Sequence, residues 1–580
     1  MENIKEIQFD TNTKDKILEI LSRHNFKNEL EFRIGEYKWV NNKSVFETNN
    51  EIDYFYRLKN LLTEYGINYK KFNTIEKIYN ENNYNVKEIF NKDDKTIIYQ
   101  QKKKIYTYNI YDFNLRIAIS KENIIKQYKS NNDYVLREKE RYSFDLKYCN
   151  IDLTKVKQDN KIMFEIELEL KEKINIDMLN KILSLILFTK DLSQNIITVS
   201  EKNKIINEYK QIFNTIFFVG AQPETLQKHL IHELGKIEYA ITDKADGDRY
   251  ILFISSDKNV YFIDNNIKKV LKTDIKSNLY YSTVIDGELI RKNDKYIFLA
   301  FDIIAFNNKD LRGDNTQHLK TRLNRLNHII YSINNEYNDK YFEIRMKKYY
   351  YKNIFLGAKK IMDDIENKDY ENDGLIYTPM NECYPVNKKW KMLLKWKPSE
   401  MNTVDFYAIK DVNSNIWNLY VQHYNSKNPK SCINELVLFD VNKLCENNKT
   451  DTKTFITYIS EDLIDPITKE PYETNTVIEF KWDKTKNMWI PLRTRWDKTY
   501  NVNKFGNFSS VACNIWNSIH NPVNLEDLFI YINKSQNKQD ENTFFFKTMR
   551  IFHNNIKRNL YDKYLKNTNN LLELSSIIYI

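Results

Sequence analysis

Two short stretches of the chain alternate glutamate with apolar residues. The first, NELEFRIG, sets Glu29 and Glu31 on one face and apolar residues on the other. The second, MFEIELEL, does the same with Glu165, Glu167 and Glu169. A period of two predicts β-strands that bury one face. Either stretch alone is typical of an edge strand with a solvated face, but two copies favour a shared acidic surface.

If the two glutamate faces meet, they need a cation, because clustered carboxylates repel each other and their pKa values shift upward. Carboxylate oxygens suit Mg²⁺ or Mn²⁺. Two further predicted strands, FNLRIAISKE and YVLREKERYSF, lie between the glutamate stretches. Arg116 lies in the first, and Arg137, Lys139 and Arg141 alternate in the second. These side chains are candidates to bind a triphosphate on the remaining wall.

Asp-Gly pairs recur beside apolar runs in the middle of the chain. The sequence contains ten glycines, and three of them follow aspartate, in YAITDKADGDRYILF, STVIDGELI and ENDGLIYTP. Each run predicts a strand next to a point where the backbone needs glycine. Lys244 lies just before the first pair, and its two interpretations are a solvated hairpin end and a nucleophile.

Other basic residues are predicted to gather near Lys244. Lys395 and Lys397 alternate in KMLLKWKPSE, so both can point to one face of a strand. Together with Arg249, these cations would lower the pKa of Lys244 and hold a triphosphate.

Carboxylates and an aromatic ring complete this predicted site. Glu288 and Asp373 are candidates to bind ribose hydroxyls or Mg²⁺. Phe301, in YIFLAFDII, is a candidate to stack on a base, although a plain core position is the more frequent outcome for such a residue.

Composition bounds the class of protein. The 580 residues suffice for roughly three to four domains, and a content of 42% hydrophobic and 14% aromatic residues predicts folded cores. A formal net charge of +10 permits a polyanionic partner. We see no apolar run that could span a bilayer and no signal peptide in MENIKEIQFD, so we expect a soluble cytoplasmic protein without a membrane partner. The five cysteines lack CxxC or paired-His spacing, and we expect reduced thiols rather than a disulfide framework or a zinc site.

The ordered set KADGDR, DGE, FDI, DGLIY, LLKWKP and RWDK resembles the covalent nucleotidyltransferase superfamily of mRNA capping guanylyltransferases and ATP-dependent ligases. One such motif is weak, but six in order over about 250 residues are specific. The resemblance implies that Lys244 becomes linked to a nucleoside monophosphate through a phosphoramide while pyrophosphate leaves. The nucleotide-binding residues that it implies are Asp246, Arg249, Glu288, Phe301, Asp373, Lys395, Lys397, Arg495, Asp497 and Lys498.

The last of these motifs lies in an OB-type domain that the resemblance implies after Pro398. This domain would close over the nucleotide and orient the leaving pyrophosphate. In PLRTRWDKTY, Arg493 and Arg495 alternate, which predicts that RWDK continues a basic strand.

Residues 20–205 resemble the tunnel-shaped, metal-dependent RNA triphosphatases, which are antiparallel barrels with glutamate and basic strands. The resemblance implies that Mg²⁺ or Mn²⁺ positions water to attack the γ-phosphate of 5′-triphosphate RNA. The implied metal ligands are Glu29, Glu31, Glu167 and Glu169, with Glu165 as a further candidate. The implied triphosphate-binding residues are Arg116, Arg137, Lys139 and Arg141.

Joined by the connector FFVGAQPETLQ, the two units resemble the multifunctional mRNA capping enzymes of large cytoplasmic DNA viruses and related cytoplasmic elements. This resemblance implies GTP as substrate, GMP bound covalently to Lys244, and GpppN-RNA as the product. The rival interpretations are an ATP-dependent polynucleotide ligase and a catalytically silent RNA-binding subunit. The two glutamate strands argue against the ligase, and the complete set of charged positions argues against the silent subunit.

We therefore expect an α+β multidomain chain. Its expected parts are a barrel over 1–210, a nucleotidyltransferase domain over 211–398, an OB-fold domain over 399–510 and a short helical tail over 511–580. The tail segment FFKTMRIFHNNIKRNLYDKYL resembles the lead-in to a guanine-N7 methyltransferase, but no glycine follows Gly506 to form a cofactor loop. We expect no methyltransferase activity, and a separate cap methyltransferase and the transcription machinery are candidate partners beside 5′-triphosphate RNA.

Overall fold

The computed structural model describes two compact units. The described residues are 4–524 without 26, 130–132, 160, 293–294, 338, 340, 352, 388, 413, 425–433 and 500–504, together with 527 and 577–578. Unit 1 comprises Met1–Lys204, Glu461–Glu473 and Arg493–Val502, and unit 2 comprises Ile205–Ser460, Thr474–Leu492 and Asn503–Ile580. Across these described ranges, no helix combines the length and apolar character needed to cross a membrane. Most of the expected tail lies outside the described residues.

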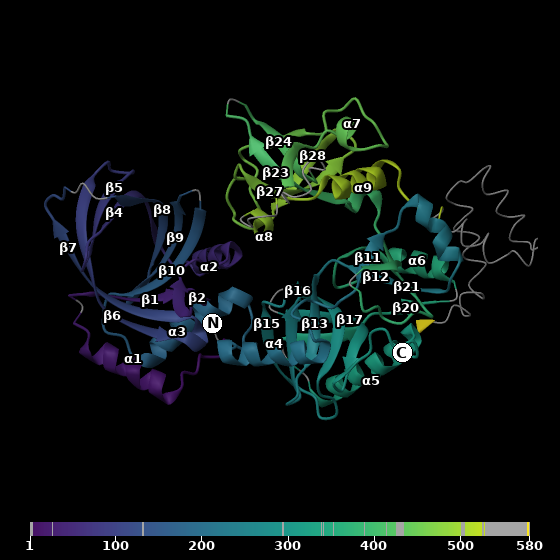
Figure 1. Cartoon of the computed structure of the whole chain (residues 1–580), viewed down its shortest axis with the longest axis horizontal. Coiled ribbons are helices and arrows are strands. Elements are labelled where there is room, and N and C mark those ends of the chain that lie inside the picture. Colours follow the sequence, from purple (N-terminus) through teal and green to yellow (C-terminus); the bar gives the residue numbers. More distant parts are fainter. Residues whose placement is uncertain are drawn as a thin grey trace, which may run out of the picture. The chain divides into compact units, whose positions relative to one another are not determined.

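A closed antiparallel barrel forms the centre of unit 1 (Figure 1). Closure gives every strand two neighbours, so the glutamate strand β1 pairs with both β10 and β7 and is not an edge strand. The expected barrel is confirmed. Its strands, in order around the barrel, are β1 (Glu29–Ile34), β10 (Lys161–Leu170), β9 (Cys149–Gln158), β8 (Tyr134–Asp145), β4 (Tyr69–Asn80), β5 (Asn85–Asn91), β6 (Ile97–Ile110) and β7 (Leu115–Ile125).

The apolar outer face of the barrel packs against helices. Leu30, Phe32 and Ile34 of β1 point outward into a core that they share with the helices, which leaves the glutamates of β1 facing inward. A two-stranded sheet of β2 and β3 follows β1 outside the barrel. The remaining elements of residues 1–213 are α1 (Thr11–Arg23), α2 (Ile52–Glu64), α3 (Ile176–Asp191), α4 (Val199–Phe213), β2 (Glu36–Val40), β3 (Lys43–Glu47) and the 3₁₀ turn η1 (Tyr111–Phe113).

Two sheets of unit 2 carry the central motifs. The first consists of β11 (Gln222–Thr225), β22 (Lys389–Trp396), β21 (Asn372–Pro379), β12 (Tyr239–Ala245), β20 (Tyr349–Tyr350) and β29 (Ile577–Ile578). The second consists of β15 (Val270–Lys276), β14 (Asn259–Asp264), β13 (Asp248–Ile254), β16 (Thr283–Lys292), β17 (Lys295–Phe306), β18 (Lys309–Asp310) and β19 (Phe342–Met346). Among the helices, α5 packs against β17 and α6 against β12. The helical elements are α5 (Leu319–Glu336), α6 (Ile354–Asp363), η2 (Lys228–Gly235) and η3 (Ile365–Asn367).

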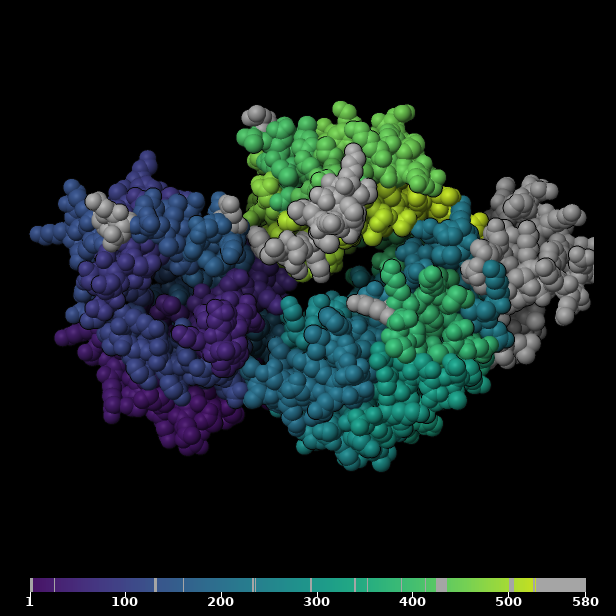
Figure 2. Space-filling view, viewed as in Figure 1, coloured from purple at the N-terminus to yellow at the C-terminus, as the bar shows by residue number. Residues whose placement is uncertain are grey.

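A third sheet occupies the range expected for the OB-type domain. Its elements are β25 (Asn434–Leu438), β24 (Ile416–Tyr424), β23 (Thr403–Lys410), β27 (Thr476–Asp483), β28 (Met488–Thr494), β26 (Ile456–Tyr458), η4 (Ser399–Met401), α7 (Val441–Leu444), α8 (Trp496–Thr499) and α9 (Ser509–His520). Helix α9 lies against β23 and β24 of this sheet, and its yellow atoms adjoin the green atoms of the sheet in Figure 2.

The expectation that all cysteines are reduced is wrong for one pair. Cys445, at the end of α7, and Cys513, in α9, form a disulfide across 68 residues. The packing of α9 brings the two thiols together, and their spacing in the sequence carries no sign of it. Cys149 and Cys383 are free thiols.

Candidate functional site

Lys244 lies at the seam between two sheets. It is the penultimate residue of β12, which pairs with β21 and β20, whereas β13 after the turn pairs with β14 and β16. The hairpin interpretation is therefore wrong, because the strands that flank the turn belong to different sheets. The crossing also explains the glycine after Asp246, since a Cβ on Gly247 would lie 2.8 Å from Cγ1 of Ile290.

An ion-paired cluster surrounds the Lys244 ammonium. Its Nζ lies 2.7 Å from Oδ1 of Asp373, and Lys397 pairs with the other oxygen of the same carboxylate. Lys395, in β22, is close enough that its pKa is lowered, first by burial and then by Lys244 and Lys397. The structure thus gathers these four candidate residues. Gly374 permits this arrangement, because it has φ of +153° and a Cβ there would lie 2.0 Å from the Trp396 carbonyl oxygen.

Arg249 has different partners from those expected. Its Nε and Nη2 donate to the two oxygens of Asp286 at 3.0 and 2.6 Å, and its Nη1 donates to the Ala221 carbonyl at 2.5 Å. Burial and the Asp286 carboxylate act in opposite directions, and the carboxylate prevails, so the pKa of Arg249 is raised. Tyr384 also donates to Asp286 at 2.6 Å. Arg249 therefore ties the connector to the sheet, and its guanidinium is already engaged.

Phe301 is half-buried in β17. The Arg249 guanidinium and the Lys347 ammonium each lie 5.5 Å from its ring centroid. Lys347 is buried, pairs with Glu288 at 2.9 Å, and donates to the Asp243 carbonyl at 3.2 Å. Burial alone would lower the pKa of Lys347, but the charges of Glu288 and Asp243 outweigh burial, and the pKa is raised. This places a protonated donor beside an aromatic face.

The RWDK motif is not part of the strand that was expected. β28 ends at Thr494, and Trp496–Thr499 form the single turn α8, so the alternation of Arg493 with Arg495 does not continue. Arg495 pairs with Asp497 at 3.0 Å within the motif. Arg495, Asp497 and Lys498 belong to unit 1, whereas Lys244 belongs to unit 2.

Asp246, the remaining candidate for nucleotide binding, is exposed in the turn after Lys244.

The two glutamate strands meet inside the barrel. Glu31 is the register partner of Glu169, and Arg33 is the partner of Glu167. Arg33 bridges the strands, because its guanidinium lies 2.5 Å from Glu31 and 3.2 Å from Glu167. The expected shared acidic surface is therefore present, and Arg33 neutralises part of it.

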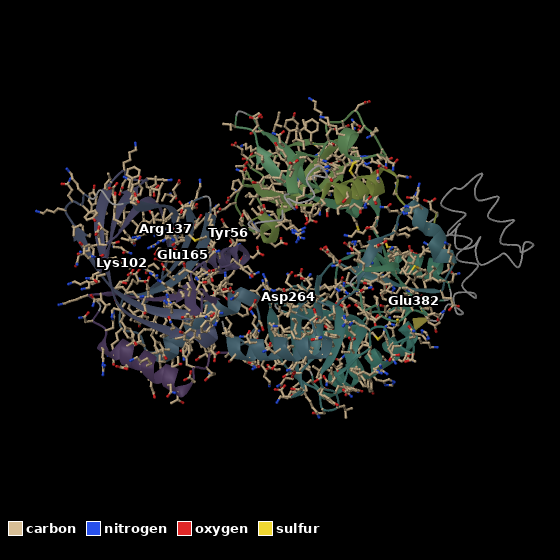
Figure 3. The ribbon with its side chains drawn as sticks, viewed as in Figure 1. Tyr56, Lys102, Arg137, Glu165, Asp264 and Glu382 are labelled. Atoms are coloured by element: carbon tan, nitrogen blue, oxygen red, sulfur yellow. A yellow bond between two sulfur atoms is a disulfide. The ribbon has the colours of Figure 1, made fainter. Side chains whose placement is uncertain are left out.

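A lysine from β6 neutralises another part. Lys102 pairs with Glu29, lies 2.9 Å from Glu122 and lies 3.9 Å from Glu31. Its side chain is only 17% exposed. Figure 3 shows Lys102 among the barrel strands together with Arg137 and Glu165.

The expected upward pKa shifts occur for three of the four glutamates. Burial and then Glu167 raise the pKa of Glu31 to about 7. Burial also raises the pKa values of Glu29 and Glu169. For Glu167, burial acts upward, but Arg33 and Arg141 outweigh it, and the pKa is lowered.

The basic strand β8 lines another wall, and each of its cations has an acidic partner. Arg137 lies 2.7 Å from Glu165, Lys139 lies 2.7 Å from Glu76, and Arg141 lies 3.2 Å from Asp152. Burial lowers the pKa of Lys139 to about 8.

Arg116 lies apart from the β8 cations. Its guanidinium donates to Asn109 at 2.8 Å and lies 4.6 Å from the ring centroid of Phe46.

The chemistry of these donors fits a hard divalent cation. Several carboxylates lie inside one barrel, and burial holds three of them in an environment that disfavours their charge. Within the described part of the chain, however, no three His, Cys, Asp or Glu side chains are already gathered closely enough to hold a metal ion. Lys102 and Arg33 are the cations that balance the glutamates instead.

Sequence reasoning missed three cations that pair with the site carboxylates, namely the half-buried Arg33 and Lys102 and the buried Lys347. Arg33 was recognisable, because it continues the alternation of Glu29 and Glu31. Lys102 and Lys347 carried no such signal, since neither belongs to an alternating motif, and each meets its carboxylates through long-range packing.

The seam lysine and its ordered motifs are the features that resemble covalent nucleotidyltransferases. The family models for the mRNA capping enzyme catalytic domain and C-terminal domain match residues 188–399 and 401–529. The chain belongs to the mRNA capping enzyme family. Within this family, the nucleotide substrate is GTP.

Individual relatives agree with this assignment. A probable mRNA-capping enzyme of Acanthamoeba polyphaga mimivirus is 28% identical over 549 residues, which cover 76% of this chain and 46% of the relative. The mRNA-capping enzyme of Mus musculus is 28% identical and is matched over 55% of this chain and 50% of its own length. The chain thus spans about half of each of these two relatives. A solved S. pombe RNA triphosphatase in complex with the Spt5 CTD is 19% identical, with a TM-score of 0.25 over 31% of this chain and 85% of that one.

Proposed function

We propose that the chain performs two consecutive steps of mRNA 5′-capping. The first removes the γ-phosphate of 5′-triphosphate RNA inside the barrel, and the second transfers GMP from GTP to the resulting diphosphate end. The observation that carries the second step is Lys244 at the sheet seam, with Asp373, Lys395 and Lys397 around it. We propose that both steps act on RNA in the cytoplasm, away from any membrane.

In the transfer step, the neutral Lys244 amine attacks the α-phosphorus of GTP. A bond forms between Nζ and phosphorus, the bond to the bridging oxygen breaks, and pyrophosphate leaves with that electron pair, while Nζ gives up a proton to solvent. Lys395 and Lys397 supply positive charge to the phosphates. The β-phosphate oxygen of the RNA diphosphate end then attacks the same phosphorus, and Lys244 leaves to regenerate the amine and form GpppN-RNA.

The Lys347 ammonium supports GTP over ATP. It lies beside the face of Phe301, where a stacked base would present its edge. Guanine presents acceptors at both O6 and N7, whereas adenine presents an acceptor at N7 and a donor at N6. An ammonium can only donate hydrogen bonds. It can therefore donate to O6 of guanine, but it leaves the adenine amino group without a partner.

In the barrel, the chain's own residues bind and orient the triphosphate. Arg137, Lys139 and Arg141 project from one strand toward the acidic wall, so they neutralise phosphate oxygens opposite the glutamates. Mg²⁺ or Mn²⁺ held by Glu29, Glu31, Glu167 and Glu169, with Glu165 nearby, would supply Lewis-acid polarisation of the γ-phosphate and a bound water.

Labelling with α-³²P nucleotides tests the transfer site. GTP should label the wild-type chain covalently, ATP should not, and pyrophosphate should reverse the reaction. Lys244→Ala should abolish labelling, while Lys391→Ala, which removes an exposed lysine from β22, should retain it. Labelling by ATP alone would indicate a ligase, and a chain that no nucleotide labels would be the silent subunit.

Phosphate release from γ-labelled triphosphate RNA tests the barrel site. Glu167→Ala should abolish metal-dependent release yet leave GMP labelling of Lys244 intact, and the outward Glu138→Ala should change neither. Loss of both activities in a folded Glu167→Ala protein would contradict the division into two sites. We also propose a separate cap methyltransferase and the transcription machinery as partners of the chain.

A further inference from the structure

The β2–β3 hairpin carries an exposed tryptophan. The hairpin forms its own two-stranded sheet outside the barrel. Trp39 is 79% exposed, more than any other aromatic side chain among the described residues. Because an indole ring gains much from burial, such exposure on a folded element marks a surface that contacts something else.

The hairpin is braced against the barrel, so the exposure of Trp39 does not come from a loose loop. The Tyr37 ring lies 4.8 Å from Phe46 and 4.5 Å from Tyr111, measured between centroids. The Tyr37 hydroxyl donates to the Leu115 carbonyl at 2.7 Å. At the base of the hairpin, a Cβ on Gly35 would lie 2.1 Å from the Glu47 carbonyl oxygen, so only glycine permits this close approach.

One face of the hairpin is aromatic. Trp39 is the register partner of Ser44, and Tyr37 is the partner of Phe46. Side chains two residues apart share a face, so Trp39, Tyr37 and Phe46 lie on the same side. We call these three residues the hairpin face.

The hairpin face continues into the barrel lining. The Arg116 guanidinium lies over the rings of Phe46 and Tyr37, at 4.6 and 5.9 Å from their centroids. Arg116 is the register partner of Arg33, which binds Glu31 and Glu167 inside the barrel.

The returning chain reaches the same end of the barrel. There the Thr48 hydroxyl donates to Glu165 at 3.1 Å. Both ends of the hairpin therefore join the barrel where candidate catalytic residues lie.

We propose that the hairpin face binds the first unpaired nucleotides of an RNA whose 5′-triphosphate occupies the barrel, with Trp39 stacking on a base. This inference rests on the proposed triphosphatase function. An RNA held by its 5′ end must extend out of the barrel, and aromatic rings next to cations are the usual platform for unpaired nucleotides. Lys38 and Lys43 lie on the opposite face of the hairpin, and Lys38 pairs with Glu47. The cation next to the hairpin face is therefore Arg116.

The test is RNA binding by the full chain in EDTA, which prevents hydrolysis. A fluorescent ten-nucleotide 5′-triphosphate RNA should bind Trp39→Ala about tenfold more weakly than wild type, since stacking of one base is worth roughly that factor or more. Trp39→Phe should recover most of the affinity. Ile124→Ala, which truncates another exposed apolar residue of the same barrel, is the matched control and should bind like wild type. Thermal melting confirms that each variant is folded.

Abasic substitutions identify the base that stacks. In wild type, an abasic site at one of the first nucleotides should cost about tenfold in affinity, and in Trp39→Ala the same abasic site should cost nothing further. Two results would overturn the proposal and point to a protein partner for this face. One is that the affinity losses from Trp39→Ala and from the abasic site multiply when combined, and the other is that Trp39→Ala leaves RNA affinity unchanged. Phosphate release by the wild type is scored separately, so failure of the triphosphatase function is distinguishable from failure of the RNA platform.

Discussion

Replacing Lys102 by methionine should make the stability of the barrel depend on divalent metal. Methionine keeps much of the side-chain length but removes the ammonium that pairs with Glu29 and Glu122 and approaches Glu31. Glu29 and Glu122 would then lose the cation that they share, and Glu31 would keep only Arg33. Because the Lys102 side chain is only 17% exposed, water cannot fully replace the lost charge.

The expected cost is at the low end of the range for breaking a buried ion pair, about 3 kcal/mol. For a unit of this size, roughly 2–4 °C of melting temperature correspond to 1 kcal/mol, so the barrel should melt about 6–12 °C lower in EDTA. If the glutamates hold Mg²⁺ or Mn²⁺, a concentration of metal about 100 times its Kd restores about 2.7 kcal/mol. Metal should therefore recover most of the loss.

Calorimetry with and without metal measures both effects. Lys155→Met is the matched control, because this lysine of β9 pairs with Glu473 at 2.8 Å rather than with the acidic wall. It should lose about 1 kcal/mol or less and respond to metal only as much as the wild type does, because its glutamates are unchanged. If Lys102→Met melts at the same temperature in EDTA and in metal, the glutamates do not form the metal site that we propose.

Three further predictions concern the transfer site and the third sheet. Lys347→Met should reduce the preference for GTP over ATP in lysine labelling about tenfold, and an unchanged ratio would exclude contact with the base. In single-turnover kinetics, Arg495→Ala should slow adduct formation about a hundredfold but leave transfer of GMP from a preformed adduct nearly unchanged. The reason is that only the first step has a pyrophosphate to hold. Equal losses in the two steps would indicate a structural role. Cys445→Ser should lower the free energy of unfolding by about 4 kcal/mol for a loop of this length, and the difference from wild type should vanish when both are melted in reductant.

Alternation along the chain was sufficient to predict the glutamate strands and their acidic face, whereas the barrel was implied by the resemblance to tunnel-shaped RNA triphosphatases. Glu31 and Glu169 belong to segments that the sequence alone predicts to be strands. Both lie on the polar face that the alternation predicts. The Asp-Gly pairs likewise pointed to strands near Lys244, and the structure gathers Lys244, Asp373 and Lys395. Only Asp246-Gly247 joins two sheets, since Asp286-Gly287 lies inside β16 and Asp373-Gly374 inside β21.

What sequence reasoning could not supply was pairing over long distances. Lys102 meets Glu29 across 73 positions, and nothing in QQKKK distinguishes this lysine from its neighbours. Arg249 lies in the expected motif, yet Asp286 and a carbonyl of the connector take up its guanidinium, and motif spacing does not reveal such competition. RWDK was expected to extend a strand, but Trp496 packs into an apolar core, and the backbone turns to bury it.

The burial of Trp496 bears on how this protein can be divided for experiments. Its indole stacks on Tyr56 of α2 at 6.4 Å between centroids, and Lys59 of the same helix pairs with Glu470. Residues far along the chain thus complete the surface of the N-terminal barrel. A fragment ending near residue 204 would leave Tyr56 and an uncompensated Lys59 facing solvent, so we expect it to aggregate or melt early. Supplying the missing segments on a linker, rather than trimming at the apparent boundary, is the better route to an isolated barrel.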